Sequence, residues 1–267
     1  MNIFVCVKQV PDSRSEIKAN INANDIETEH ISWDINPEDE CAMEQALLIR
    51  EQITDTSITA IRVGEKQDNE ALISALAMGA DDAILVNTSG QQLDPFLTAR
   101  ALKNVIEQSN KKADLVLCGN KSFGDESGEV PQMLAQMLNL PCLNKVSRCC
   151  IDKNELYLER IIENGIKEKY LLYLPAVIAC SYGINTPRYA AFPHIQSAYK
   201  KPFSELDLQA IGIKTNQSLI HYSNYRLLPE NETGDIFYAN DQTKIDAVIP
   251  EIVDILDSMN LLPENKS

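Results

Sequence analysis

The chain has 267 residues, 44% of them hydrophobic, and a formal net charge of −15. This length suits an α/β domain with a C-terminal extension, and this hydrophobic content supports a packed core and argues against a disordered chain. The negative charge repels phosphates and anionic lipids, so we expect no nucleic acid partner and no membrane insertion, while one nucleotide held by local backbone N–H groups stays compatible with it.

Apolar strands and helices alternate from the start of the chain. Residues 2–9 read NIFVCVKQ and predict a buried strand, and residues 30–33 predict a second one. A helix is expected to follow Asn36, because Asn is a good N-cap, Pro37 suits the first helical position and acidic residues occupy the first turn.

The same strand-and-helix unit recurs up to about residue 140. Gly79 is expected to end one of its helices, because glycine readily adopts a positive φ. This alternation predicts a parallel, doubly wound sheet. The expected strands cover 57–63, 83–86 and 114–118, and the expected helices cover 67–78, 94–107 and 131–138.

The pattern changes after residue 140. Residues 155–162 and 166–173 flank the pair Asn164-Gly165, which is typical of a tight hairpin turn. Residues 174–181 predict one more buried strand. We therefore expect an antiparallel hairpin added to the parallel core.

The C-terminal part is polar and irregular from about Pro202 and ends in an amphipathic helix at 241–259, interrupted at Pro250. We expect a nucleotide-binding α/β domain of residues 1–203 and an arm with a helix, residues 204–267, that contacts a partner subunit. The alternative is a tail that folds back on its own domain.

Three segments are expected to meet beyond the carboxyl ends of the strands, where open α/β sheets bind ligands: 7–13, 35–40 and 119–130. The last segment contains glycines and serines and enters a helix, a combination suited to phosphate. It is neither a Rossmann glycine fingerprint nor a P-loop, so a plain connecting loop is the alternative. The acids Asp125, Glu126 and Glu129 would repel phosphate unless they point away.

Cysteine and histidine spacing argues against several function classes. The seven cysteines contain no CxxC pair and the three histidines have no metal-ligand spacing, so we expect reduced thiols, no metal and a cytoplasmic protein. We expect no secretory signal and no transmembrane helix. No hydrolase or kinase motif occurs.

Residues 184–203 are rich in proline and aromatic side chains and carry two lysines near their end. A loop stiffened by proline loses little entropy on docking, so this segment suits a partner anchor. A loop packed on its own domain is the alternative.

Taken together, the chain resembles electron transfer flavoprotein beta subunits over roughly residues 1–203. The matching segments occur in the family's order: VCVKQVPDS, INPEDECAMEQAL, ALAMGADDAILV, DLVLCG with the glycine-rich loop, LPAVIA, NTPRY and AYKKP.

The resemblance implies a Rossmann-like fold and an electron-carrier subunit without substrate turnover of its own. It would pair with an alpha subunit that binds FAD, accept electrons from acyl-CoA dehydrogenase-type flavoenzymes, pass them to a downstream acceptor, and hold AMP or a second FAD itself.

The family's site residues fall on three regions of this chain. The adenine nucleotide contacts correspond to Cys6, Asn36, Val63, Gly119, Asn120, Lys121, Ser122, Phe123, Gly124, Asp125, Glu126, Ser127, Gly128, Glu129 and Val130. The turn at Asp12 and Ser13 would face the flavin of the alpha subunit. The docking loop corresponds to Asn185, Pro187, Arg188, Tyr189, Phe192 and Ile195, with Phe192 as its apolar anchor.

Two residues depart from the family's loop, which usually has Gln and Gly where this chain has Glu129 and Pro131. An ionised Glu donates no hydrogen bond, and Pro lacks a backbone N–H. We expect nucleotide binding to survive in a weakened or altered form. AMP and FAD both stay open, with a lean toward FAD because the CVKQVPD, INPED and AYKK details resemble the clostridial, often electron-bifurcating branch.

Two other functions fit the same fold. An adenylating or ATP-hydrolysing enzyme would need a glycine-containing loop after the first strand, where residues 7–13 have none. A stress-type nucleotide sensor would lack the long C-terminal arm.

Overall fold

The computed structural model describes residues 1–20, 25–27, 30–67, 69–214, 218–220 and 241–259. The chain divides into two compact units, Met1–Tyr225 and Arg226–Ser267.

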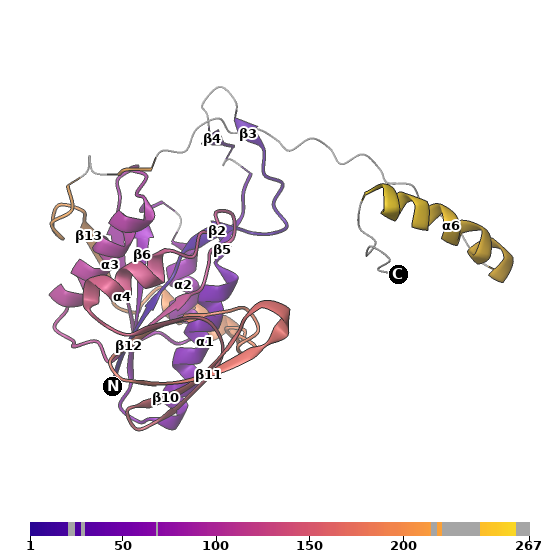
Figure 1. Ribbon diagram of the computed structural model, residues 1–267. Helices are drawn as coiled ribbons and strands as arrows, with labels where there is room; N and C mark the ends of the chain where they lie inside the picture. Colours follow the sequence, from indigo (N-terminus) through magenta and orange to yellow (C-terminus); the bar gives the residue numbers. More distant parts are fainter. Residues whose placement is uncertain (21–24, 28–29, 68, 215–217, 221–240, 260–267) are drawn as a thin grey trace. The chain divides into compact units, whose positions relative to one another are not determined.

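A nine-stranded sheet forms the centre of the first unit (Figure 1). Its order is β11-β10-β9-β12-β8-β1-β6-β7-β13, and every pairing from β9 across to β13 is parallel, whereas β10 runs antiparallel to both of its neighbours. The predicted Rossmann-like, mostly parallel sheet with an antiparallel hairpin is therefore confirmed. The strands are β1 (Asn2–Cys6), β6 (Ser57–Gly64), β7 (Asp82–Asn87), β8 (Leu115–Gly119), β9 (Cys142–Asp152), β10 (Glu155–Ile161), β11 (Lys167–Tyr173), β12 (Ala176–Cys180) and β13 (Phe203–Asp207).

Helices cover both faces of this sheet. Helices α1 (Pro37–Gln52) and α2 (Glu70–Met78) pack on one face, and α3 (Pro95–Gln108) and α4 (Val130–Leu138) pack on the other. Because side chains alternate along a strand, Ile3 and Val5 of β1 face α1 while Phe4 and Cys6 face the opposite layer.

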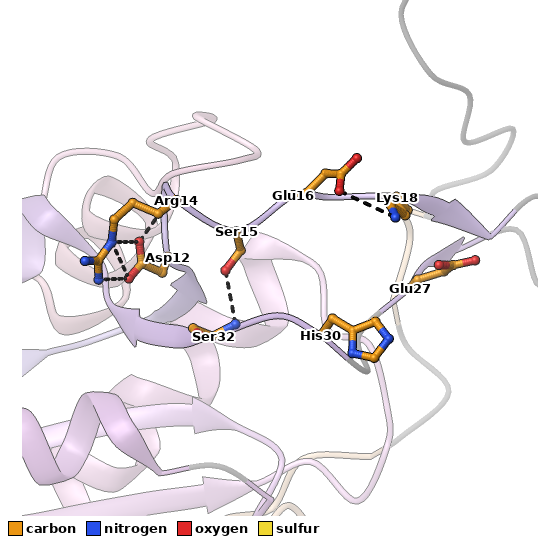
Figure 2. A pocket seen from close by; sticks show the side chains of 8 residues that line it. All are labelled: Asp12, Arg14, Ser15, Glu16, Lys18, Glu27, His30 and Ser32. Carbon is orange, nitrogen blue, oxygen red and sulfur yellow. Dashed lines mark hydrogen bonds and ion pairs between the residues drawn. The ribbon is translucent and has the colours of Figure 1, made fainter.

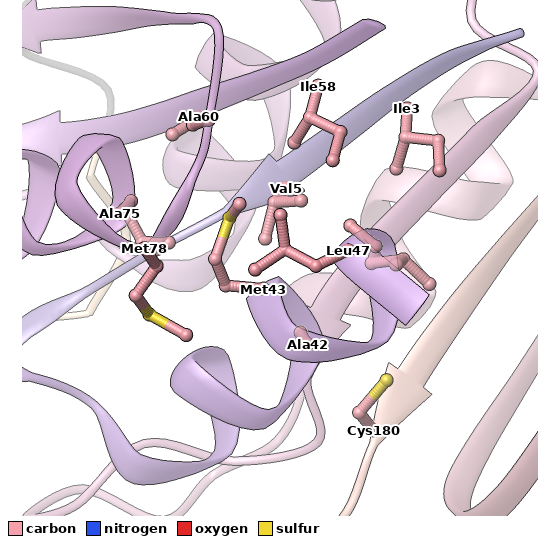
Figure 3. Close-up of a cluster of buried hydrophobic side chains, with 14 of the residues drawn as sticks. Ile3, Val5, Ala42, Met43, Leu47, Ile58, Ala60, Ala75, Met78 and Cys180 are labelled. Carbon is pink, nitrogen blue, oxygen red and sulfur yellow. The ribbon is translucent and has the colours of Figure 1, made fainter. Parts of the chain in front are cut away.

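Figure 3 shows the first of these two cores. Met43 and Leu47 of α1 lie against Ile3 and Val5 of β1, with Ile58 of β6 beside them. All five side chains are buried, so α1 is fixed against the sheet along its length.

Short elements complete the chain. β2 (Gln9–Pro11) pairs with β5 (Trp33–Ile35), and β3 (Ala19–Asn20) pairs with β4 (Asp25–Ile26), outside the main sheet. The strand expected at 30–33 is therefore displaced: the extended residues are those of β5. The remaining elements are the 3-10 turn η1 (Glu163–Gly165), α5 (Phe192–Ala198) and α6 (Gln242–Ser258).

Turn chemistry explains the hairpin. Asn164 and Gly165 have φ values of 59° and 71°, and the tight turn between β10 and β11 needs positive φ at both positions.

Strand β9 has no counterpart among the predicted strands. Its pairing with β12 shifts register between Ile178 and Cys180, and Lys145 has a φ of 54°. This bulge breaks the alternation of buried and exposed side chains from which a strand is predicted.

The beginning of the expected C-terminal arm belongs to the first unit. β13 pairs in parallel with β7, and Leu208, Ile211 and Ile213 are buried in the layer below α3. Up to residue 213 the chain thus folds back on its own domain. Residues 215–217 and 221–240 of the expected arm lie outside the described residues.

The second unit contains α6, whose N-cap Asp241 accepts a hydrogen bond from the Lys244 backbone N–H at 2.9 Å. An exposed apolar stripe runs along the helix, which confirms the predicted amphipathic pattern. The expected interruption at Pro250 is wrong, because the helix continues through it at the cost of one backbone hydrogen bond. The stripe consists of Ile245, Ile249, Ile252 and Val253.

Among the described helices, none is both long and apolar enough to cross a lipid bilayer.

Candidate functional site

The strand order has its switch point between β1 and β8. The chain proceeds from β1 to β6 and β7 on one side, and places β8 and β12 on the other. In open α/β sheets the loops that follow the two strands at the switch point run to opposite faces of the sheet, and ligands bind in the crevice between them. In this chain those loops begin at Val7 and at Asn120.

Asp39 of α1 joins these two loops. Its carboxylate accepts a hydrogen bond from the Lys8 N–H at 2.8 Å and another from the Gly119 N–H at 2.7 Å. Burial raises the pKa of Asp39 to about 7, while the two N–H bonds act in the opposite direction. The carboxyl group is therefore a buried junction between the ends of β1 and β8.

Two further side chains at the start of α1 hold the β8–α4 loop, residues 120–129. Asn36 accepts from the Phe123 N–H at 3.0 Å and donates to the Lys121 carbonyl at 3.0 Å. Glu38 accepts from the Lys121 N–H at 2.7 Å and from the Tyr182 N–H at 3.2 Å. Asn36 is the predicted N-cap of α1, but its side chain makes these tertiary bonds instead of a capping bond.

Gly119 is a position where no side chain fits. A Cβ there would lie 2.4 Å from the Asp39 Oδ1 and 2.9 Å from the Glu38 Cβ. The absence of a side chain thus lets the end of β8 approach the first turn of α1.

Two lysines near the site form ion pairs with acids of the β8–α4 loop. The Lys8 Nζ lies 2.8 Å from the Asp125 carboxylate and 3.0 Å from the Ser122 hydroxyl. The Lys121 Nζ lies 2.8 Å from the Glu126 carboxylate. Two of the acids expected to repel phosphate, Asp125 and Glu126, are thus paired with neighbouring lysines.

The start of α4 carries the two departures from the family's loop. Glu129 is exposed at the N-cap position and makes no side-chain capping bond, and Pro131 is buried in the first turn. Of the first three residues of α4, only Val130 and Gln132 have a backbone N–H to offer to an anion.

The other predicted nucleotide contacts lie at the same edge of the sheet. Cys6 ends β1 and Val63 precedes the last residue of β6. Cys6 as a whole is only 7% exposed. The structure thus brings Cys6, Asn36, Val63 and the β8–α4 loop to one edge.

Asp12 and Ser13 belong to a different feature. Asp12 lines a cavity of about 530 Å³ between the segments that carry β2 and β5 (Figure 2), whereas Ser13 is exposed and does not line it. A hydrogen bond from Arg14 lowers the pKa of Asp12 to about 2. The cavity is lined by Asp12, Arg14, Ser15, Glu16, Lys18, Glu27, His30 and Ser32, and no β8–α4 loop residue is among them.

The expected docking segment is anchored at one end and exposed at the other. Asn185 donates to the Cys41 carbonyl at 3.0 Å, and the Arg188 guanidinium makes two bonds of 2.8 Å to the Glu44 carboxylate. Tyr189 is 99% exposed and Phe192 is 70% exposed.

Pro187, between the two anchoring residues, is half-buried. Ile195 lines a second cavity of about 600 Å³ together with side chains of α2. Of the six residues expected to dock a partner, Asn185 and Arg188 thus anchor the segment to α1, while Tyr189, Phe192 and Ile195 are exposed.

Sequence reasoning missed Lys8, Glu38, Asp39 and Glu44 as site residues. The first three stand in the segments 7–13 and 35–40 that were expected at the site, but the acids were interpreted as complements of the helix dipole. Nothing in the sequence marks Glu44 as the partner of a residue 144 positions away.

Comparisons with known proteins agree with one another. A family model described as electron transfer flavoprotein domain matches residues 25–211. The electron transfer flavoprotein subunit beta of Bacillus subtilis (strain 168) is 34% identical over 215 residues, which cover 80% of this chain and 81% of that protein. The protein of the same name from Thermoanaerobacterium thermosaccharolyticum is 30% identical and covers 98% of this chain and 100% of its own length. The mitochondrial one from Oryza sativa subsp. japonica is 32% identical and covers 91% and 95%.

Proposed function

The chain belongs to the family of electron transfer flavoprotein beta subunits, and from this premise we propose that it is the nucleotide-binding subunit of a heterodimeric electron carrier. Its partner is an FAD-binding alpha subunit. Electrons come from an acyl-CoA dehydrogenase-type flavoenzyme and leave to a downstream acceptor. We place the complex in the cytoplasm, in keeping with the seven free cysteines.

One observation carries the nucleotide assignment: the β8–α4 loop stands at the switch point of the sheet and is tied to α1 by Asn36, Glu38 and Asp39. Such preordered loops bind the phosphates of nucleotides through backbone N–H groups and hydroxyls. Ser122, Ser127 and the N–H of Val130 supply these groups here. AMP and FAD share the adenosine phosphate that this loop would hold, and both remain candidates for it.

The chain's own residues bind and orient, and the flavin of the alpha subunit supplies the redox chemistry when bound. We assign the segment with Asp12 and Ser13 to the surface that faces this flavin. The apolar stripe of α6 is assigned to contact with the alpha subunit, because exposed apolar patches of this kind mark interaction surfaces.

The docking role of Phe192 is tested by Phe192→Ala in the complex with the alpha subunit. An exposed aromatic anchor that fills a partner's pocket contributes about 2 kcal/mol or more, so kcat/KM for reduction by the dehydrogenase should fall by roughly thirtyfold or more. The nucleotide content should stay unchanged.

The matched control is Phe96→Ala, because Phe96 is 48% exposed and lies at the start of α3. Equal kinetics for both variants and the unsubstituted complex would remove Phe192 from the docking surface.

A further inference from the structure

The Asp125 carboxylate occupies a ring of three hydrogen-bond donors. The Lys8 Nζ lies 2.8 Å from it, the Ser122 hydroxyl donates to it, and the Ser127 backbone N–H also bonds to it. An ammonium, a hydroxyl and a backbone N–H around one anion form the donor set that a phosphate oxygen requires. The three donors come from two chain segments, the end of β1 and the β8–α4 loop, that only the fold brings together.

We propose that the Asp125 carboxylate stands in for the phosphate of the nucleotide, and that Lys8 exchanges one anion for the other when the nucleotide binds. This inference rests on the proposed function, because it names the cation and the internal competitor of that same site. It adds Lys8 to the binding residues and gives Asp125 the role of a displaceable pseudo-ligand.

The charges of the loop favour an exchange over simple addition. A phosphate placed beside Lys8 while Asp125 remained there would stand next to an ionised carboxylate, which is unfavourable. Burial tends to raise the pKa of Asp125, but the bonds from Lys8 and Ser122 outweigh it and keep that pKa below its usual range. The carboxylate therefore stays charged at neutral pH and must leave its place for the phosphate.

The turn that carries Asp125 is exposed and has open space beside it. Gly124 has a φ of 106°, and apart from its chain neighbours no heavy atom lies within 4 Å of where its Cβ would be. The turn itself is held by a bond of 3.0 Å from the Glu126 N–H to the Ser122 carbonyl. Lys8, in contrast, is fixed at its backbone by Asp39. On binding, we therefore expect the exposed turn with Asp125 to move while the Lys8 backbone keeps its bond to Asp39.

The neighbouring pair of Lys121 and Glu126 does not share this geometry. The Lys121 Nζ contacts the Glu126 carboxylate at 2.8 Å, whereas among the described contacts it is Lys8 that bonds to both a loop carboxylate and the Ser122 hydroxyl. Lys121 is therefore not the cation that we assign to the phosphate.

The test measures AMP and adenosine binding to the full chain freed of nucleotide, by titration calorimetry. Asp125→Asn should tighten AMP binding about threefold to tenfold, since it removes the competing charge. Lys8→Met should weaken AMP binding about tenfold or more, since it removes a charge-assisted hydrogen bond. Adenosine lacks the phosphate, so its affinity should be the same in all variants.

A double variant checks the exchange itself. In the Lys8→Met background, Asp125→Asn should have a smaller effect on AMP binding than in the unsubstituted chain, because the two side chains act on one site. The charge-matched controls are Glu107→Gln and Lys103→Met, a pair on α3 with a contact of 2.6 Å, in which Glu107 is exposed and Lys103 half-buried, and they should leave AMP binding unchanged.

The outcomes separate this inference from the proposed function. AMP binding that neither Asp125→Asn nor Lys8→Met alters overturns the exchange and leaves the nucleotide site standing. Absence of AMP, FAD and adenosine binding in both the unsubstituted chain and Asp125→Asn overturns the nucleotide site. Binding by Asp125→Asn alone supports the exchange. Asp125→Ala repeats the test if Asp125→Asn is poorly folded.

Discussion

At the scale of single residues, Asp39 couples the site to pH. Its folded pKa of about 7 lies above the ordinary value of 3.8 because burial penalises the charged form. The folded chain therefore holds this proton more tightly than the unfolded chain does. The associated stability is fully present below about pH 3.8 and is lost as the pH rises through about 7.

We predict that Asp39→Asn removes this contribution. The difference between the melting temperature of the unsubstituted chain and that of the variant should decrease as the pH rises from 4 to 7. We expect a decrease of about 2–4 °C for each kcal/mol of proton-linked stability. Thermal unfolding of both proteins over this range checks it. Parallel curves would mean that Asp39 titrates in the folded chain as it does in the unfolded one.

Gly119 sets how closely β8 approaches α1. Gly119→Ala would bring a Cβ to 2.9 Å from the Glu38 Cβ and 3.0 Å from the Asp39 backbone N, so these atoms must shift. We expect a loss of about 1–3 kcal/mol in the free energy of unfolding and a weaker nucleotide affinity.

The control for this prediction is Gly64→Ala, at the end of β6. There the added Cβ meets only the end of the Arg62 side chain, at 3.0 Å, so the loss measured by urea unfolding should be smaller. Equal losses would contradict the account of Gly119.

At the scale of elements, helix α1 serves both ends of the site. Its first turn holds the β8–α4 loop through Asn36 and Glu38, and Glu44 in its middle holds the docking segment through Arg188. The contacts that fix α1 against the sheet therefore also fix these two segments relative to each other.

We predict that Arg188→Met loosens the docking segment without unfolding the sheet. Glu44 and Glu51 raise the pKa of Arg188, which stays charged, and its contacts to them are 2.8 Å and 2.9 Å. Because the Glu44 carboxylate is buried and loses its partner, whereas Arg188 is partly exposed, the loss of global stability should be about 1–3 kcal/mol. Limited proteolysis within residues 185–195 should be several times faster.

Arg148→Met is the control for Arg188→Met, because Arg148 pairs with Glu159 at 3.7 Å on an exposed surface. Equal cleavage rates within residues 185–195 in both variants would show that Arg188 does not anchor the segment.

Elements with local signals were predictable from the sequence. The helix after Asp94 begins as expected, because the Asp94 side chain accepts the Leu97 N–H at 2.8 Å, and the turn at Asn164-Gly165 joins its two strands. Strand β9 and strand β13 were missed. A bulge hides the alternation of β9, and β13 is an edge strand with mostly exposed side chains, so neither carries a clear periodicity.

At the scale of the whole molecule, the alternation of strands and helices predicts a parallel, doubly wound sheet, and the ligand edge of such a sheet lies at the carboxyl ends of its strands. The glycine-rich loop and Asn36 were predicted at this edge, and the structure places them there. The pairing of Lys8 with Asp125, 117 residues apart, was beyond sequence reasoning, because nothing local relates the two side chains.

The central claim is that this chain, as a beta subunit, holds an adenine nucleotide in the β8–α4 loop. The most direct measurement is to copurify the chain with its alpha subunit, release the bound nucleotides and identify them by chromatography and absorbance. We predict one FAD for the alpha subunit and, for this chain, one AMP or one further FAD, which Gly119→Ala should diminish. A stable complex with a single FAD and nothing in the beta site, or no complex at all, would contradict the account.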